Sequence, residues 1–89
     1  MQVTDNPAQH RYELSLDGHT AFASYRRDGD VLLVYHTEVP REFESRGIGS
    51  ALVKAMLELA RAEGLKVKPL CSFVSAYMQR HPEFADLRA

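Results

Sequence analysis

The spacing of apolar residues changes near Gly47, and this change constrains the fold more than any other feature. Before it, Tyr12, Leu14 and Leu16 alternate with polar residues, which is the period of a half-buried strand. After it, apolar residues recur every three or four positions, as on one face of a helix: Ile48, Leu52, Met56, Leu59 and Ala60. The chain therefore begins with strands, and a helix that ends before Gly64 packs against them.

Two Asp-Gly pairs divide the first part of the chain into strands. This dipeptide favours the positive backbone angles of a two-residue hairpin turn. The pairs separate three runs that we expect to be strands, at residues 11–16, 20–26 and 30–39. Because residues 31–35 are apolar on both faces, we expect a central strand that is covered on both sides.

The order of elements after the helix completes the predicted fold. Residues 65–70 follow a strand and a helix, so they are expected to pair in parallel with the third strand. Apolar spacing then predicts a second helix that ends near His81-Pro82. We predict an α/β (α+β) fold with a mixed sheet of about four strands in the order β-β-β-α-β-α. A chain of 89 residues forms one domain, 1–89, with residues 1–9 as a flexible lead-in.

Composition excludes several classes of protein. The net charge is −1, from 11 basic and 12 acidic residues, so no global field attracts nucleic acid or anionic lipid. Cys71 is the only cysteine, which excludes an internal disulfide and fits a reducing compartment. No apolar stretch approaches the roughly 20 residues of a membrane helix, and the N-terminus has no signal-peptide pattern. We expect a cytoplasmic protein without a bound metal.

The turn between the third strand and the helix is the strongest chemical signal. Gly47 and Gly49 allow close approach to a ligand, and a helix N-terminus carries about half a positive charge. Such a turn binds phosphate, with Arg46 and Ser50 as further donors. Alternatively, the glycines only permit a tight turn and close packing. A P-loop is excluded because the turn has no lysine, and a dinucleotide fingerprint because position 52 is Leu.

These residues resemble a known family. Val39-Pro40 with residues 45–52, SRGIGSAL, resembles the coenzyme A-binding motif of the GNAT superfamily of N-acetyltransferases. The segments VKPLCSFV at 67–74 and HPEF at 81–84 are similar to the small YjdJ-type branch of that superfamily. The resemblance covers about residues 10–87 and implies acetyl-CoA as the co-substrate. It also implies a sheet that splays between the third strand and residues 67–70.

The resemblance assigns residues to the coenzyme. It places the pantetheine arm along Thr37, Glu38 and Val39 and the pyrophosphate on the turn. The implied binding set is Thr37, Glu38, Val39, Ser45, Arg46, Gly47, Ile48, Gly49 and Ser50. Tyr77 falls where the superfamily often has a tyrosine near the coenzyme sulfur, a candidate general acid. Glu44 departs from the family pattern of Gln or Arg, and we expect it to face away from the phosphates.

Two further positions are candidates for the chemistry. His36 and Glu38 share one face of their strand, and either could act as a base, directly or through water. Alternatively, His36 is a packed strand residue. Cys71 precedes a helix N-terminus, which lowers a thiol pKa, so it could accept the acetyl group and pass it on. Alternatively, it is a small buried apolar residue.

Three functions follow from these signals. The first is an acetyl-CoA-dependent N-acetyltransferase that acts on an amine of an unknown small-molecule or protein acceptor. The second is a non-enzymatic acetyl-CoA/CoA-binding or sensor domain, and the third is a scaffold with structural glycines. The first two predict coenzyme A binding, whereas the third does not. The exposed strand edge beside residues 11–16 leaves a monomer or a weak homodimer open.

Overall fold

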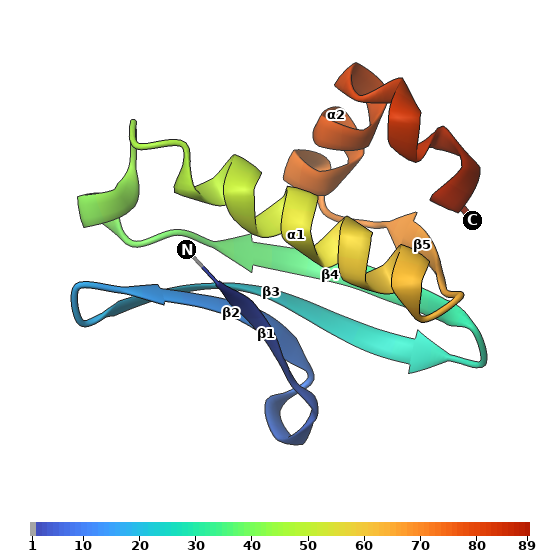
Figure 1. The fold of residues 1–89 in the computed structure, drawn as a ribbon, viewed down its shortest axis with the longest axis horizontal. Coiled ribbons are helices and arrows are strands. Elements are labelled where there is room, and N and C mark those ends of the chain that lie inside the picture. The colour runs from blue at the N-terminus through green and yellow to red at the C-terminus, as the bar shows by residue number, and fades with distance from the viewer. Residues whose placement is uncertain (1) are drawn as a thin grey trace.

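The computed structural model describes residues 2–89 as a five-stranded sheet with helices packed against it (Figure 1). The strands are β1 (Val3–Asn6), β2 (Arg11–Leu16), β3 (His19–Asp28), β4 (Val31–Glu38) and β5 (Lys66–Pro69). The α-helices are α1 (Ile48–Ala62) and α2 (Ser72–Arg80), and short 3-10 helices are η1 (Pro7–Gln9), η2 (Arg41–Phe43) and η3 (Pro82–Leu87). The strands follow chain order in an antiparallel sheet, except that β4 and β5 are parallel. The predicted α+β class and mixed sheet are confirmed.

The N-terminal segment is a fifth strand and a 3-10 helix rather than the expected lead-in, although Met1 lies outside the described residues. Val3 pairs with Leu14 on β2, so β1 covers the strand edge that the sequence left open. The Asp5 carboxylate also accepts a hydrogen bond from the Tyr25 hydroxyl at 2.6 Å. These contacts join residues far apart in the chain, and the sequence pattern of residues 3–6 alone does not predict them.

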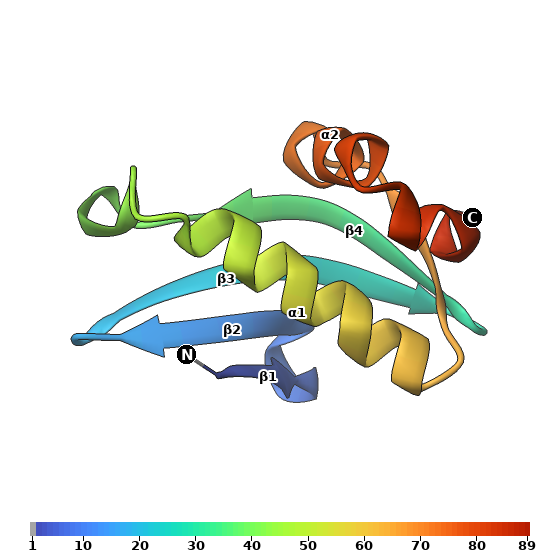
Figure 2. The same ribbon diagram turned by 45° about the horizontal axis from the view of Figure 1, so that its top comes forward.

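Both α-helices cover the same face of the sheet (Figure 2). Leu14, Ala23 and Val34 of this face are fully buried in one core with Leu52 and Met56 of α1. No helix of residues 2–89 covers the opposite face.

The expectation that residues 31–35 are covered on both faces is therefore wrong. Leu32 and Val34 are buried, Leu33 is half-buried, and Tyr35 is 46% exposed. An apolar run has the same pattern whether a helix or only the flanking side chains of the sheet shield its second face.

A β-bulge in β4 changes which side chains face the helices. Tyr25 of β3 pairs with Val34, but Ser24 pairs with His36, so Tyr35 is an extra residue. The alternation of faces shifts at this point. Val34 before the bulge and Thr37 after it both lie on the helix side, while His36 lies on the bare face near Phe22.

Each of the two predicted hairpin turns contains a glycine with positive φ. Asp17 and Gly18 both have positive φ, 53° and 78°, as the first Asp-Gly pair predicts. The second turn comprises Gly29 and Asp30, one residue later than the pair itself, because Asp28 pairs with Val31. No helix within residues 2–89 combines the length and the apolar character needed to cross a membrane.

Candidate functional site

The chain enters α1 through a sharply turned loop. Pro40 ends β4, and the ring of Phe43, 1% exposed, anchors η2 to the core. Ser45 and Gly47 then have positive φ values of 67° and 73°. Glycine adopts this region without strain, whereas serine does so at a cost. The backbone of this loop is therefore held in an uncommon shape directly before the helix.

The first amides of α1 are free. The Arg46 amide donates to the Phe43 carbonyl, and the next backbone donor is Ala51, which bonds to Gly47. No side chain caps the helix. Among residues 2–89, no backbone or capping partner is therefore found for the N–H groups of residues 47–50. Four unpaired donors at the positive end of a helix are an arrangement that favours an anion.

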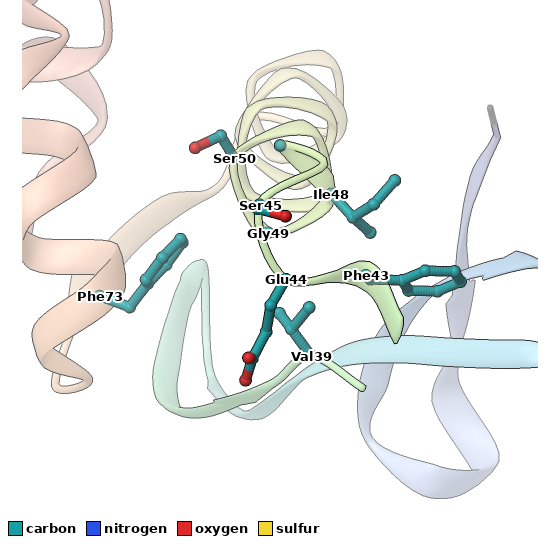
Figure 3. Close-up of a pocket in the computed structure, with 9 residues that line it drawn as sticks. Val39, Phe43, Glu44, Ser45, Ile48, Gly49, Ser50 and Phe73 are labelled. Carbon is teal, nitrogen blue, oxygen red and sulfur yellow. The ribbon is translucent and has the colours of Figure 1, made fainter. Parts of the chain in front are cut away.

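A hollow of about 260 Å³ lies against these amides (Figure 3). Its wall is largely apolar and comes from β4, the loop, and the starts of both helices. The lining residues are Val39, Phe43, Glu44, Ser45, Gly47, Ile48, Gly49, Ser50 and Phe73. The volume lies just below the 300–1,000 Å³ typical of whole-ligand pockets. The hollow thus suits a phosphate and its neighbouring atoms, and the rest of a long ligand would run across the surface.

The packing around Gly49 explains why the residue is a glycine. A Cβ at this position would lie 3.0 Å from the Phe73 ring and 3.3 Å from a methyl group of Val39. Any side chain there would press on the Phe73 ring and take up space in the hollow. At Gly49 the structure therefore supports the explanation of close packing, and phosphate binding stays a prediction.

Most of the predicted binding set meets at the hollow, but not all of it. Val39, Ser45 and residues 47–50 line it, whereas Thr37, Glu38 and Arg46 do not. The Arg46 guanidinium lies 3.8 Å from the Asp17 carboxylate and 5.7 Å from the centre of the Phe43 ring.

Glu44 was expected to face away from this region but lines the hollow (Figure 3). Its extended backbone, with φ −61° and ψ 144°, follows the last residue of η2. The direction of one side chain in an irregular loop is not encoded in the sequence pattern.

The predicted splay of the sheet lies beside the hollow. The last pair between β4 and β5 is Val34 with Pro69. The Val34 carbonyl then accepts from the amides of Leu70, at 2.9 Å, and Cys71, at 3.1 Å. Beyond this point residues 36–38 pair only with β3. A stretch of β4 edge is thus left for an extended partner.

One side-chain contact bridges the splay. The Thr37 hydroxyl lies 3.5 Å from Cys71 Sγ, and Cys71 is half-buried. Burial raises the pKa of the Cys71 thiol, but hydrogen bonds from the Thr37 side chain and from the amides of Val74 and Phe73 outweigh it. The pKa is lowered overall, in the direction that a helix N-terminus predicts. Thr37 was predicted to bind the coenzyme but not to contact Cys71, because its orientation depends on the bulge.

His36 and Glu38 lie on the bare face of the sheet. His36 Nε2 is 3.4 Å from Glu38 Oε1, and the two side chains are 53% and 62% exposed. They share a face, as predicted, and His36 is not a packed core residue. They lie on the opposite side of β4 from Thr37 and Cys71.

Tyr77 packs away from the hollow. Its ring stacks on His81 at 3.8 Å and lies 6.3 Å from Phe84 of η3. Burial, with the charges of Glu83 and Glu58, raises the pKa of its hydroxyl. Tyr77 is thus protonated at neutral pH, and the structure does not bring it to the lining of the hollow.

Sequence analysis missed Phe43 and Phe73, which build the apolar wall, because isolated aromatic residues carry no positional signal. Through the described part of the chain, no group of three or more His, Cys, Asp or Glu side chains gathers that could hold a metal ion.

Comparison with known proteins adds independent findings. The family model of the GCN5-related N-acetyl-transferase matches residues 11–87. Protein NATD1 from Xenopus tropicalis and from Homo sapiens are each 38% identical over 47 residues, or 53% of this chain. The match spans only 43% and 42% of those relatives. The solution structure of a GCN5-like protein from Staphylococcus aureus has a TM-score of 0.76 and 25% identity, covering 99% of this chain and 87% of that one.

Proposed function

Because the chain belongs to the GCN5-related N-acetyltransferase family, we propose that it binds acetyl-CoA and transfers the acetyl group to an amine. The observation that carries this proposal is the row of free amides at residues 47–50, which faces a hollow beside an unpaired strand edge. A phosphate group and an extended amide-bearing arm need these two features side by side.

The pyrophosphate is proposed to lie on the amides of residues 47–50. Ser45 and Gly47 hold the loop so that these donors point outward, and the α1 N-terminus supplies positive potential. Arg46 is proposed as a charged partner, which requires it to leave Asp17. The exposed Asp17–Arg46 pair is weak, so this exchange costs little.

The pantetheine arm is proposed to lie along the free edge of β4. The backbone of Thr37, Glu38 and Val39 would bond to its amides as a neighbouring strand would. This arrangement directs the thioester into the splay, which Thr37 and Cys71 border from the helix side and His36 and Glu38 border from the bare face.

Two routes for the transfer are proposed from this geometry. In the direct route, the amine nitrogen bonds to the acetyl carbon, the carbon–sulfur bond breaks, and the coenzyme sulfur leaves with its electron pair. The amine proton passes to His36 or Glu38. In the other, the Cys71 thiolate bonds to the acetyl carbon while the carbon–sulfur bond to the coenzyme breaks and the coenzyme thiolate leaves. The amine nitrogen then bonds to the acetyl carbon, the bond to Cys71 Sγ breaks, and the amine proton again passes to His36 or Glu38. The lowered pKa of Cys71 supports the second route.

Tyr77 stays a predicted proton donor to the leaving sulfur. Its raised pKa keeps the hydroxyl protonated, as a donor needs, but its ring is fixed against His81. Tyr77→Phe lowers turnover without loss of acetyl-CoA binding if the hydroxyl donates the proton. Unchanged turnover would assign the residue to packing.

Calorimetric titration with acetyl-CoA, together with an assay of released coenzyme thiol, tests the proposal. Gly49→Glu places a carboxylate among the free amides, so we expect affinity to fall by about a hundredfold or more. Ala62→Glu is the matched control, because it adds the same group to an exposed position of α1, about 20 Å along the helix.

The outcomes separate the candidate functions. Binding that Gly49→Glu abolishes, with thiol release that depends on an amine, is the expected result. Binding without release under any amine would leave a coenzyme-binding domain. A folded protein that does not bind millimolar acetyl-CoA would overturn the proposal.

A further inference from the structure

Tyr35 and Leu70 are exposed apolar side chains that the proposed acetyl-CoA site does not use. Within residues 2–89, the large apolar side chains that remain exposed are Tyr35 at 46%, Leu70 at 57% and Phe73 at 38%. Phe73 belongs to the hollow. The other two cost free energy in water and contribute little to the core, so their exposure calls for another explanation.

Both side chains lie at the mouth of the splay. Tyr35 follows Val34 and Leu70 follows Pro69, and Val34 and Pro69 form the last pair of β4 and β5. The Leu70 amide still bonds to the Val34 carbonyl, so the backbones remain adjacent here. Tyr35 and Leu70 therefore flank the point at which the strands part.

Their side chains share the bare face of the sheet. Tyr35 and His36 together oppose Ser24 in the bulge, and His36 lies on the bare face. On β5, Leu65 and Val67 are buried, so the alternate residues Lys68 and Leu70 face the other way. We call Tyr35 and Leu70 the shelf.

Opposite charges flank the shelf. On one side, the Glu38 carboxylate is 62% exposed and lies 3.4 Å from His36. On the other side, Lys68 pairs with Leu33, which precedes Tyr35 by two residues on β4. The surface thus offers an anion, an apolar middle and a cation in order along the strands.

We propose that the shelf selects the acceptor: an apolar monoamine whose ammonium group lies at Glu38 and whose carbon chain lies on Tyr35 and Leu70. Charge complementarity places the ammonium at Glu38, and Lys68 disfavours a second cation at the far end. The inference rests on the proposed acetyl transfer and names the class of its acceptor. His36 and Glu38 then accept the proton that the ammonium loses before its nitrogen bonds to the acetyl carbon.

Steady-state kinetics with three amines tests the inference. Pentylamine carries an apolar chain, cadaverine has the same chain with a second amine, and ethanolamine is short and polar. We expect kcat/KM for pentylamine to exceed those for cadaverine and ethanolamine by about tenfold, the ratio for roughly 1.4 kcal/mol of apolar contact.

Variants of the shelf sharpen the test. Leu70→Ser and Tyr35→Ser lower kcat/KM for pentylamine several-fold, through KM, and leave ethanolamine unchanged. Leu70→Met and Tyr35→Phe are the matched controls, because they keep the apolar surface. Since both positions are exposed, these changes spare the fold.

Each outcome decides one question. Turnover with equal kcat/KM for the three amines, or with no response to Leu70→Ser, overturns the inference and leaves the acetyl transfer standing.

Bound acetyl-CoA without turnover overturns the transfer. In that case amide shifts at Tyr35 and Leu70 on addition of pentylamine, but not cadaverine, still support the shelf, and their absence rejects it. A concentration-dependent dimer that Leu70→Ser abolishes would assign the shelf to a second copy and overturn the inference.

Discussion

The two α-helices of this protein begin within contact of each other, yet their N-termini differ. At α1, Gly47 has a φ of 73°, and the amides that follow are free. At α2, Cys71 is extended, with φ −88° and ψ 133°, and its sulfur lies near the first amides of the helix. No side-chain hydrogen bond caps the start of α1.

The difference shows that a helix N-terminus can act in two ways. Every helix start leaves unpaired donors and positive potential. At α1, glycines keep side chains away, so the donors remain open to a ligand from outside. At α2, a thiol within the chain lies against the donors, so the same potential lowers a pKa instead. The two starts meet where Phe73 packs against Gly49.

The largest effect is expected from closing the α1 end. Gly49→Ala puts a methyl group 3.0 Å from the Phe73 ring at the wall of the hollow, so the ring must move. We expect acetyl-CoA affinity, measured by calorimetry, to fall by about tenfold. Phe73→Ala in the same chain removes the clash. If the double variant binds no better than Gly49→Ala, the clash does not explain the glycine.

The next effect concerns the α2 end. Thr37→Val removes the hydroxyl that helps to lower the pKa of Cys71, so the thiolate fraction at neutral pH falls. The alkylation rate by iodoacetamide, followed against pH, should drop several-fold at neutral pH, with its midpoint moved to higher pH. Thr37→Ser keeps the hydroxyl and should leave the midpoint in place. An unchanged midpoint in Thr37→Val would mean that the helix amides act alone.

A smaller effect compares the two ends of α1. Gly47 and Gly64 both have a φ of 73°, so alanine at either position is strained and costs about 1 kcal/mol in the free energy of unfolding. Urea denaturation should report similar losses. Only Gly47→Ala should also weaken acetyl-CoA binding, because Gly64 lies beyond the far end of the helix. Equal acetyl-CoA affinity in both variants would contradict a role of the Gly47 turn in binding.

The smallest effect is expected at the C-terminal end of α1. Arg61 donates to both carboxylate oxygens of Asp86, at 2.6 Å and 2.9 Å, and these bonds lower the pKa of Asp86. A lowered carboxyl pKa contributes stability above the unfolded pKa, which is lost as pH falls through the folded one.

Asp86→Asn should therefore lower Tm slightly near neutral pH and not at all below the carboxyl range. Asp28→Asn, at an exposed position of β3 that forms no ion pair within residues 2–89, is the control. Because the Arg61–Asp86 pair is exposed, a large loss in Tm would contradict this account.

The fold was predictable where local pattern and backbone chemistry decide it. The alternation at residues 11–16 predicted β2, and the change of period predicted α1. The Asp17-Gly18 pair predicted the turn between β2 and β3. The strand β1 was not predictable, because it depends on pairing with β2 and on the Asp5–Tyr25 bond.

The candidate site likewise has a part that was predictable from the sequence and a part that was not. The free amides follow from glycine and from the start of a helix, so the sequence predicted them. Side-chain contacts across the fold were not predictable: Arg46 with Asp17, and Thr37 with Cys71. The second depends on the extra residue in β4, which shifts the alternation of faces by one.

The most direct test of the account is the amide spectrum of the ¹⁵N-labelled protein during titration with acetyl-CoA. If the phosphates lie on the open end of α1, the largest shifts occur at the amides of residues 47–50, and those of Val74 and Phe73 change less. Shifts that are largest at the start of α2, with residues 47–50 unmoved, would contradict the claim that the glycine turn is the phosphate site.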